Sequence, residues 1–146
     1  CMAKVLFLDV DGVLNTATDF GVHADKTQRL LRIVAETQCM VVLSSSWRLH
    51  LDTQEELRTA LTRGGFGDRP WQAHTSAIAT GPPRTRRARE ILAWLRRTEI
   101  EVAAWASLDD DVGLTEDAAF AAHNVWVNPG KGLSDDNVMT AIGILQ

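Results

Sequence analysis

KVLFLDVDGVLN, residues 4–15, is the stretch that decides the fold of this chain. Its apolar run leads directly into Asp9 and Asp11, which are separated by one residue and followed by Gly12. We expect a buried strand over residues 5–10 that carries both carboxylates to its carboxyl end, the edge where open α/β sheets bind their ligands. Two carboxylates this close repel each other unless a cation or a proton lies between them. The stretch therefore predicts a Mg²⁺ site and a carboxylate that acts as a nucleophile or an acid.

Composition indicates one ordinary globular domain over residues 1–146. Apolar residues make up 45% of the chain and charged residues 23%, and the net charge is −4, so no overall positive field attracts nucleic acid. The four histidines lack the spacing of a zinc hydrolase, and Cys1 and Cys39 provide no disulfide framework. No apolar run approaches the length of a membrane span and no signal peptide is visible. We therefore expect no membrane partner and a cytoplasmic location.

Apolar runs alternate with amphipathic segments along the chain. We expect strands over residues 5–10, 40–43, 101–108 and 123–127, and helices over residues 25–37, 53–62, 85–97 and 134–145. This alternation predicts an α/β fold, a Rossmann-like three-layer sandwich with a central parallel sheet. Residues 15–24 and 46–84 are too few to form a cap domain above that sheet.

Four polar clusters follow an expected strand or open an expected helix. They are Asp9 and Asp11; Ser44, Ser45 and Ser46; Arg84, Arg86 and Arg87; and Asp109, Asp110 and Asp111. Because the carboxyl ends of parallel strands share one edge of a sheet, these clusters can converge there. Together they offer carboxylates for Mg²⁺, hydroxyl and N–H groups for phosphate oxygens, and a fixed positive charge. Phosphoryl transfer requires these groups.

In this order the clusters resemble the four motifs of the haloacid dehalogenase (HAD) superfamily of Mg²⁺-dependent phosphohydrolases. LDVDGV at residues 8–13 resembles the first motif, DxDx(T/V), and Leu43-Ser44 resembles the second. Arg86 or Arg87 resembles the third motif, and LDD at residues 108–110 the fourth. Within the superfamily, the chain resembles the small HAD domains of RNA-repair-associated (Swiss Army Knife) proteins. The resemblance spans most of the chain and implies a HAD-like fold without a cap domain.

The resemblance also implies a role for each matching residue. Asp9 would be the nucleophile that forms an aspartyl-phosphate, and Asp11 would be the general acid and base. Ser44 and Arg87 would bind the transferring phosphoryl group, and Asp109 would hold Mg²⁺ together with Asp9 and the backbone carbonyl of Asp11. The expected residues are, for catalysis, Asp9, Asp11, Ser44 and Arg87; for phosphate binding, Ser44, Ser45, Arg86 and Arg87; and for the metal, Asp9, Asp11, Asp109 and Asp110.

The identity of the catalytic cation stays open at this point. The family's third motif most often provides a lysine, whereas this chain has Arg84, Arg86 and Arg87 in the matching segment. Lys131 comes late in the chain but could reach the same edge of the sheet. The arginine-rich segment also fits a solvated helix face, with Arg86 and Glu90 spaced for an i,i+4 pair. We expect one arginine to be catalytic and the others to lie at the surface.

Several of these residues have a purely structural interpretation. Ser45 is well placed to cap the turn that follows the second strand, since serine accepts hydrogen bonds from free N–H groups. Trp94 and Trp105 are expected in the core. Trp47 and Trp71 lie near expected loops, where they either pack or stack a base or a sugar.

Our leading functional hypothesis is a phosphatase that works through an aspartyl-phosphate. Without a cap the site would be open, which suits a large phosphorylated substrate such as a nucleic-acid end. The alternative is a non-catalytic phosphate-binding or interaction module on the same fold. The presence of both Asp9 and Asp11 argues against that alternative, because a module without catalysis needs no proton shuttle. The sequence carries no indication of an oligomeric state.

Overall fold

The most apolar segments of the chain form the central strands of a parallel sheet. The structure, a computed structural model, describes residues 2–146. The strands are β1 (Ala3–Leu8), β2 (Met40–Leu43), β3 (Ala73–His74), β4 (Val102–Asp109) and β5 (Asn124–Trp126). They lie in the order β3-β2-β1-β4-β5, and every neighbouring pair is parallel. β1 is therefore the central strand, flanked by β2 and β4.

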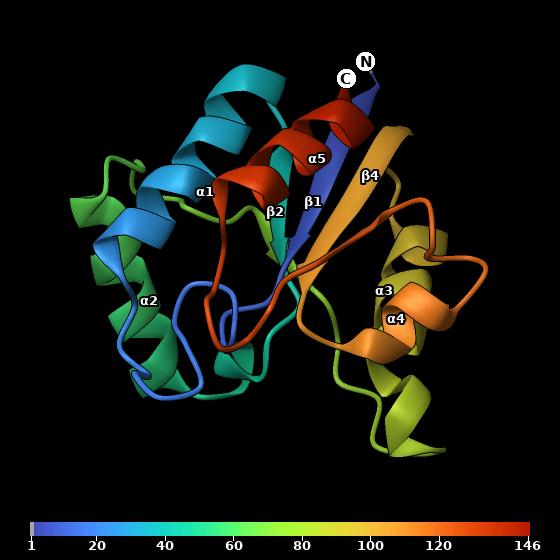
Figure 1. Ribbon diagram of the computed structural model, residues 1–146. Helices are drawn as coiled ribbons and strands as arrows, with labels where there is room; N and C mark the ends of the chain where they lie inside the picture. The colour runs from blue at the N-terminus through green and yellow to red at the C-terminus, as the bar shows by residue number, and fades with distance from the viewer. Residues whose placement is uncertain (1) are drawn as a thin grey trace.

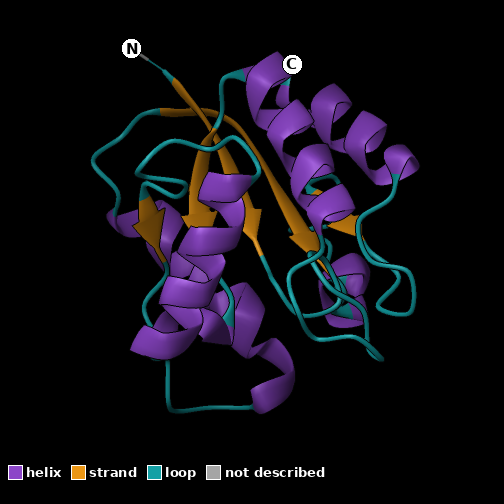
Figure 2. Cartoon of the chain, turned by 90° about the vertical axis from the view of Figure 1, so that its left-hand side faces the viewer, coloured by secondary structure: helices purple, strands orange, loops and turns teal. Residues whose placement is uncertain are grey.

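Helices cover both faces of this sheet (Figures 1 and 2). The side chains of α1 (Ala24–Thr37), α2 (Leu51–Arg63) and α5 (Asp135–Leu145) belong to one core cluster. Those of α3 (Arg86–Arg97) and α4 (Val112–Glu116) belong to the other. Two short 3₁₀ helices, η1 (Ser46–Leu49) and η2 (Pro83–Thr85), lie in the connections. The Rossmann-like three-layer sandwich with a parallel sheet is thus confirmed.

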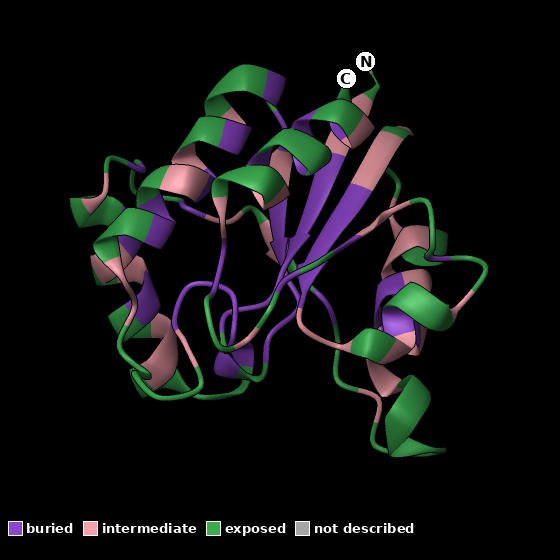
Figure 3. Ribbon diagram, in the orientation of Figure 1, coloured by how far each residue is buried: buried purple, intermediate pink, exposed green. Residues whose placement is uncertain are grey.

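Alternate side chains of β1 feed the two core clusters, as the pleat of a strand requires. Leu6 and Leu8 join the cluster under α1 and α5, whereas Phe7 joins the cluster under α3. Trp94 and Trp105 contact Phe7 edge-on, with ring centroids 5.5 Å and 5.8 Å from it. Their expected place in the core is confirmed. Figure 3 shows this pattern as a buried sheet between helices whose outer surfaces are exposed.

The structure differs from the expected elements at the ends of strands and in two short segments. β1 ends at Leu8 rather than at residue 10, and residues 11–14 form a turn. β3 and α4 were not predicted, because segments of two and five residues carry too little periodicity to be recognised. β3 is held by the main chain, since Thr75 N donates to Leu43 O over 3.0 Å.

The carboxyl ends of the strands meet at one edge of the sheet, shown at the lower side in Figure 1. Within residues 2–146, neither the connection from β1 to α1 nor the connection from β3 to α3 folds into a domain above that edge. Cys39 is a buried free thiol, and Cys1 lies outside the described residues. Among the described residues, no helix combines the length and the apolar character that a membrane crossing needs.

Candidate active site

Three carboxylates converge at the ends of the neighbouring strands β1 and β4. Asp9 follows β1 directly and is 4% exposed, and Asp109 is the last residue of β4 and is 1% exposed. Asp110 is half-buried, and one carboxylate oxygen from each of the three residues lies within 4.8 Å of the others. The two strands are in register up to Leu8 and Leu108, which brings the acidic residues side by side. The convergence that parallel topology predicts for these side chains is therefore present.

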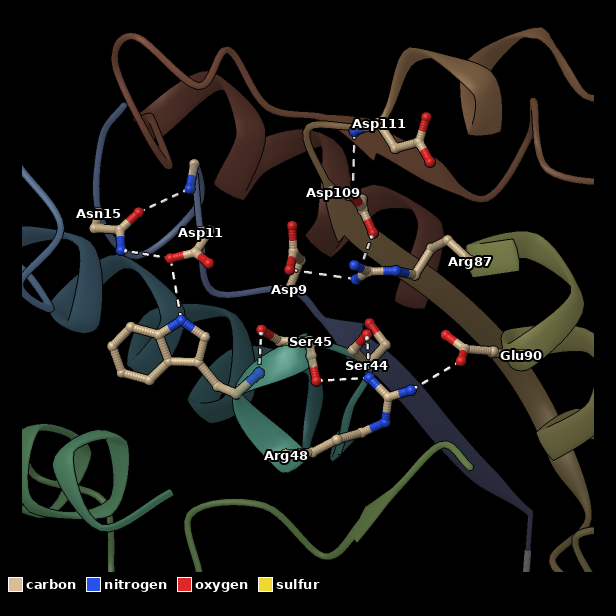
Figure 4. A network of polar contacts seen from close by, with 12 residues as sticks. Asp9, Asp11, Asn15, Ser44, Ser45, Arg48, Arg87, Glu90, Asp109 and Asp111 are labelled. Atoms are coloured by element: carbon tan, nitrogen blue, oxygen red, sulfur yellow. Dashed lines mark hydrogen bonds and ion pairs between the residues drawn. The ribbon is translucent and has the colours of Figure 1, made fainter. Parts of the chain in front are cut away.

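Arg87, from the first turn of α3, is the cation that meets this cluster (Figure 4). One of its terminal nitrogens lies 3.2 Å from Asp9 Oδ1 and 3.2 Å from Asp109 Oδ2. Burial by itself lowers the pKa of Arg87, but the carboxylates of Asp109 and Asp9 outweigh that effect and raise the pKa above its ordinary value. Arg87 therefore stays charged and serves both buried acids at once.

The single charge of Arg87 does not offset the cost of burying the carboxylates of Asp9 and Asp109. Burial, followed by the nearby charge of Asp109, raises the pKa of Asp9 well above its usual value, although Arg87 pulls it down. Burial raises the pKa of Asp109 to about 6, again against the effect of Arg87. The three aspartates offer only carboxylate oxygens, a donor set suited to a hard divalent cation such as Mg²⁺. The residues present therefore fit a metal.

Asp11 lies apart from the three-acid cluster, on the turn after β1. Its side chain is exposed, and its Oδ1 atom accepts hydrogen bonds from Trp47 Nε1 (3.1 Å) and Asn15 Nδ2 (3.0 Å). Asn15 is fully buried and also accepts a hydrogen bond from Gly12 N, which fixes the turn. The side chain of Asp11 is thus oriented by two donors and remains open to solvent. The three-acid group does not include Asp11, and metal binding through its backbone carbonyl stays a prediction.

Gly12 is required by both its backbone conformation and the space around it. Its φ of 79° lies in the left-handed region, which side chains other than glycine adopt at a cost. A Cβ atom at this position would collide with the carboxylate of Asp110 and lie 3.0 Å from Pro129 Cβ. The glycine of the DxDG motif therefore leaves room for the third acid of the cluster.

The serines after β2 have different environments. Ser44 is 1% exposed, and its hydroxyl has no hydrogen-bond partner among the described residues. Ser45 Oγ instead accepts a hydrogen bond from Trp47 N (3.2 Å) and caps η1. The capping role of Ser45 is confirmed, and phosphate binding by Ser45 stays a prediction. The hydroxyl of Ser44 thus has unused hydrogen-bonding capacity, and phosphate binding by Ser44 stays a prediction. Trp47 is 8% exposed, which confirms packing rather than stacking on a ligand.

A buried ion pair that sequence reasoning missed supports this serine loop. Arg48 Nη2 lies 2.9 Å from Glu90 Oε2, and both side chains are 5% exposed. Arg48 also donates to the carbonyl oxygens of Ser45 (2.7 Å) and Thr75 (2.9 Å), while Glu90 accepts from Ile78 N (3.0 Å). The expected pairing of Glu90 with an arginine of its own helix on a solvated face is wrong. The sequence gives no indication of the pair, because its partners are 42 residues apart.

The other candidate cations lie away from the acidic cluster. Arg84 has an 82% exposed side chain that pairs with Glu116, and Lys131 is exposed. Arg86 contacts none of the three acids and lines a neighbouring cavity. One further residue was missed: Trp126 Nε1 donates to the backbone carbonyl of Asp110 (3.0 Å) and so fixes the chain next to the third acid. Among the candidates, Arg87 is therefore the cation that the fold brings to the cluster.

Comparison with known proteins gives one match. A family model described as "HAD domain in Swiss Army Knife RNA repair proteins" matches residues 5–138. No curated protein and no solved structure matches the chain. The matched range includes every residue of the cluster and its neighbours, so the resemblance inferred from the four motifs is confirmed.

Proposed function

The chain belongs to the family of HAD domains in Swiss Army Knife RNA repair proteins, and from this premise we propose that it is a metal-dependent phosphatase. The observation that carries the proposal is the position of Asp9. Its side chain is 6% exposed, follows the central strand, and shares Arg87 and a three-acid cluster with Asp109. A buried carboxylate at this edge of the sheet, beside a fixed cation, suits nucleophilic attack on phosphorus.

Asp9, Asp109 and Asp110 would hold Mg²⁺, with the backbone carbonyl of Asp11 as a further oxygen ligand. The ion, when bound, would neutralise charge on the phosphoryl oxygens and on the buried carboxylates. In our proposal the carboxylate of Asp9 attacks phosphorus in line and forms an aspartyl-phosphate, and the P–O bond to the leaving group breaks. Asp11 gives its proton to the leaving oxygen. It then takes a proton from the water that hydrolyses the aspartyl-phosphate and releases inorganic phosphate.

Ser44 and Arg87 would hold the transferring group. The unpartnered hydroxyl of Ser44 offers a hydrogen bond to a phosphoryl oxygen, and Arg87 provides a positive charge that is already oriented by two carboxylates. Fixed donors of this kind stabilise the transition state without a reorganisation cost. Trp47 and Asn15 would keep the Asp11 carboxylate in place between its two proton transfers.

We propose the phosphorylated end of a nucleic-acid strand as the substrate class. The family description names RNA repair proteins, and the first turn of α3 carries Arg86 and Arg87, of which Arg87 contacts the acidic cluster. The carboxyl edge of the sheet carries no cap domain within the described residues, so a long substrate has access. The net charge of −4 means that this recognition would be local rather than a property of the whole surface.

The experiment is a phosphate-release assay on an aryl phosphate and on phosphorylated oligonucleotides, with Mg²⁺ and with a chelator. We expect Mg²⁺-dependent turnover in the wild type and its loss in Asp9→Asn, with Asp68→Asn on an exposed loop as the matched control. If wild type and Asp9→Asn are equally inactive on every substrate yet bind phosphate equally well, the chain is a phosphate-binding module instead.

A further inference from the structure

The cavity that Arg86 lines lies beside the acidic cluster, on the side of α3. Its volume is about 370 Å³, and it lies between η1, residues 77–79 and the start of α3. Arg87 lines this cavity and also pairs with Asp9, so it is the residue that the cavity shares with the proposed phosphoryl site. Arg86, the residue before Arg87, lines the same space. A group attached to a phosphate that Arg87 holds would therefore lie beside this cavity.

Arg86 is the charged residue of this cavity that lacks a partner for its side chain among the described residues. Arg48 and Glu90 pair with each other, and Arg87 pairs with the acids of the cluster. The carboxylate of Asp111 accepts a hydrogen bond from a backbone N–H at the start of α4. Arg86 forms no ion pair with any described residue, and its buried Nε has no hydrogen-bond partner.

Part of the remaining cavity wall is apolar, and the rim of the cavity is exposed to solvent. Leu49 is 54% exposed at the rim, and Ile78 and Pro83 contribute further apolar surface. A space whose walls are partly polar and partly apolar, with one unpaired guanidinium, suits a ligand that has a flat or aliphatic body and an anionic group. A sugar and base joined to a phosphodiester have both parts.

We propose that this cavity binds the nucleotide unit that carries the terminal phosphate, with Arg86 bonding to the next phosphodiester of the strand. The inference rests on the proposed phosphatase function and deepens it by assigning a second phosphate subsite to Arg86. It makes the preferred substrate a strand of at least two nucleotides rather than a mononucleotide. An arginine is well suited to this task, because its planar fork matches the geometry of a phosphate group.

The test compares Arg86→Gln with Arg96→Gln, which removes an exposed charge from the other end of the same helix. The kcat/KM for a terminally phosphorylated dinucleotide is divided by that for an aryl phosphate. We expect this ratio to fall about tenfold to a hundredfold in Arg86→Gln, as the loss of a charge-assisted hydrogen bond implies, and to stay constant in Arg96→Gln. An unchanged ratio in Arg86→Gln overturns the proposal.

Binding measured without turnover separates this proposal from the phosphatase proposal. In the Asp9→Asn background, calorimetry with the phosphorylated dinucleotide gives Kd with and without Arg86→Gln at two salt concentrations. We expect weaker binding and a shallower salt dependence when Arg86 is replaced. Equal Kd values for both chains overturn the subsite, whether or not the wild type releases phosphate. If Arg86→Gln weakens the binding of a phosphopeptide but not that of the dinucleotide, the assignment of the cavity to nucleic acid is overturned.

Discussion

The Arg48–Glu90 ion pair offers the sharpest test of how this fold supports its site. Replacing Glu90 by leucine removes one partner of a pair whose side chains are both 5% exposed. Arg48 would then keep a buried charge without a carboxylate, and Ile78 N would lose its acceptor. Breaking a buried pair in this way costs about 3–5 kcal/mol. For a chain of this size, each kcal/mol lowers Tm by about 2–4 °C, so we expect Tm to fall by roughly 6–20 °C.

A double-mutant cycle isolates the pair from its surroundings. We expect Arg48→Met to cost as much as Glu90→Leu, because it leaves the glutamate unpaired and releases the carbonyls of Ser45 and Thr75. The double variant should cost at least about 2 kcal/mol less than the sum of the single changes, since neither charge is then buried alone. Glu90→Gln is the matched control, because it keeps the shape and an acceptor for Ile78 N.

The assay is equilibrium unfolding in urea at constant pH, with the slope of each transition fitted separately. Equal slopes show that the variants differ in the free energy of unfolding rather than in the extent of unfolding. Single changes that cost under about 1 kcal/mol, or costs that add in the double variant, would refute the reasoning. In that case the pair would be a contact without energetic coupling, and the serine loop would be held by its backbone alone.

Three further predictions concern the acidic cluster and the turn beside it. Burial raises the pKa of Asp109 to about 6 in the metal-free folded chain, whereas the same carboxyl of the unfolded chain loses its proton near pH 4. The folded chain therefore binds more protons between these values, so the free energy of unfolding should fall as pH rises from about 4 to 6. We expect Asp109→Asn to be more stable than wild type by up to roughly 3 kcal/mol at pH 7.5 and no more stable at pH 4. Thermal unfolding in the presence of a chelator measures this difference, and a difference that does not depend on pH contradicts the prediction. Gly12→Ala should destabilise the fold by about 1–2 kcal/mol, because alanine is strained at this positive φ. It should also weaken Mg²⁺ binding in a calorimetric titration, because the new Cβ atom displaces the carboxylate of Asp110, and a variant that keeps full metal affinity would contradict this. Trp47→Phe removes one of the donors to Asp11 and should lower kcat more than it changes KM, and equal effects on both constants would count against a positioning role.

The acidic cluster and its cation were accessible to sequence reasoning for a clear physical reason. Asp9 and Asp109 each follow a continuous apolar run, and such a run in an α/β pattern is a buried parallel strand. Parallel strands end at one edge, so the order of motifs along the chain was enough to bring the carboxylates together. The same argument placed the arginine segment at this edge, because the helix that precedes β4 starts there, but it left the choice among Arg84, Arg86 and Arg87 open.

The supporting contacts were not accessible in the same way. Arg48 lies in a short segment without apolar periodicity, and Glu90 is a charged residue within the amphipathic helix α3, so the pattern marks neither as buried. Their pairing depends on how α3 packs against η1. The bond from Trp47 to Asp11 spans 36 residues and depends on one side-chain rotamer. Pairing of this kind is set by tertiary packing, which local propensity does not encode.

In the proposed function, the charge balance of the cluster would connect metal binding to substrate binding. With all three acids ionised, Asp9, Asp109 and Asp110 carry three negative charges against the single positive charge of Arg87. Arg87 already donates to two carboxylates, so a phosphate that approaches it competes with both of them. The arginine gains freedom to bind a phosphoryl oxygen when Asp9 and Asp109 have another positive partner. In the proposed function, the same burial that raises the pKa of Asp9 and Asp109 would make phosphate recognition depend on the charge state of these carboxylates. Arg86, which lines the neighbouring cavity and forms no ion pair with a described residue, would bind an anion without that competition.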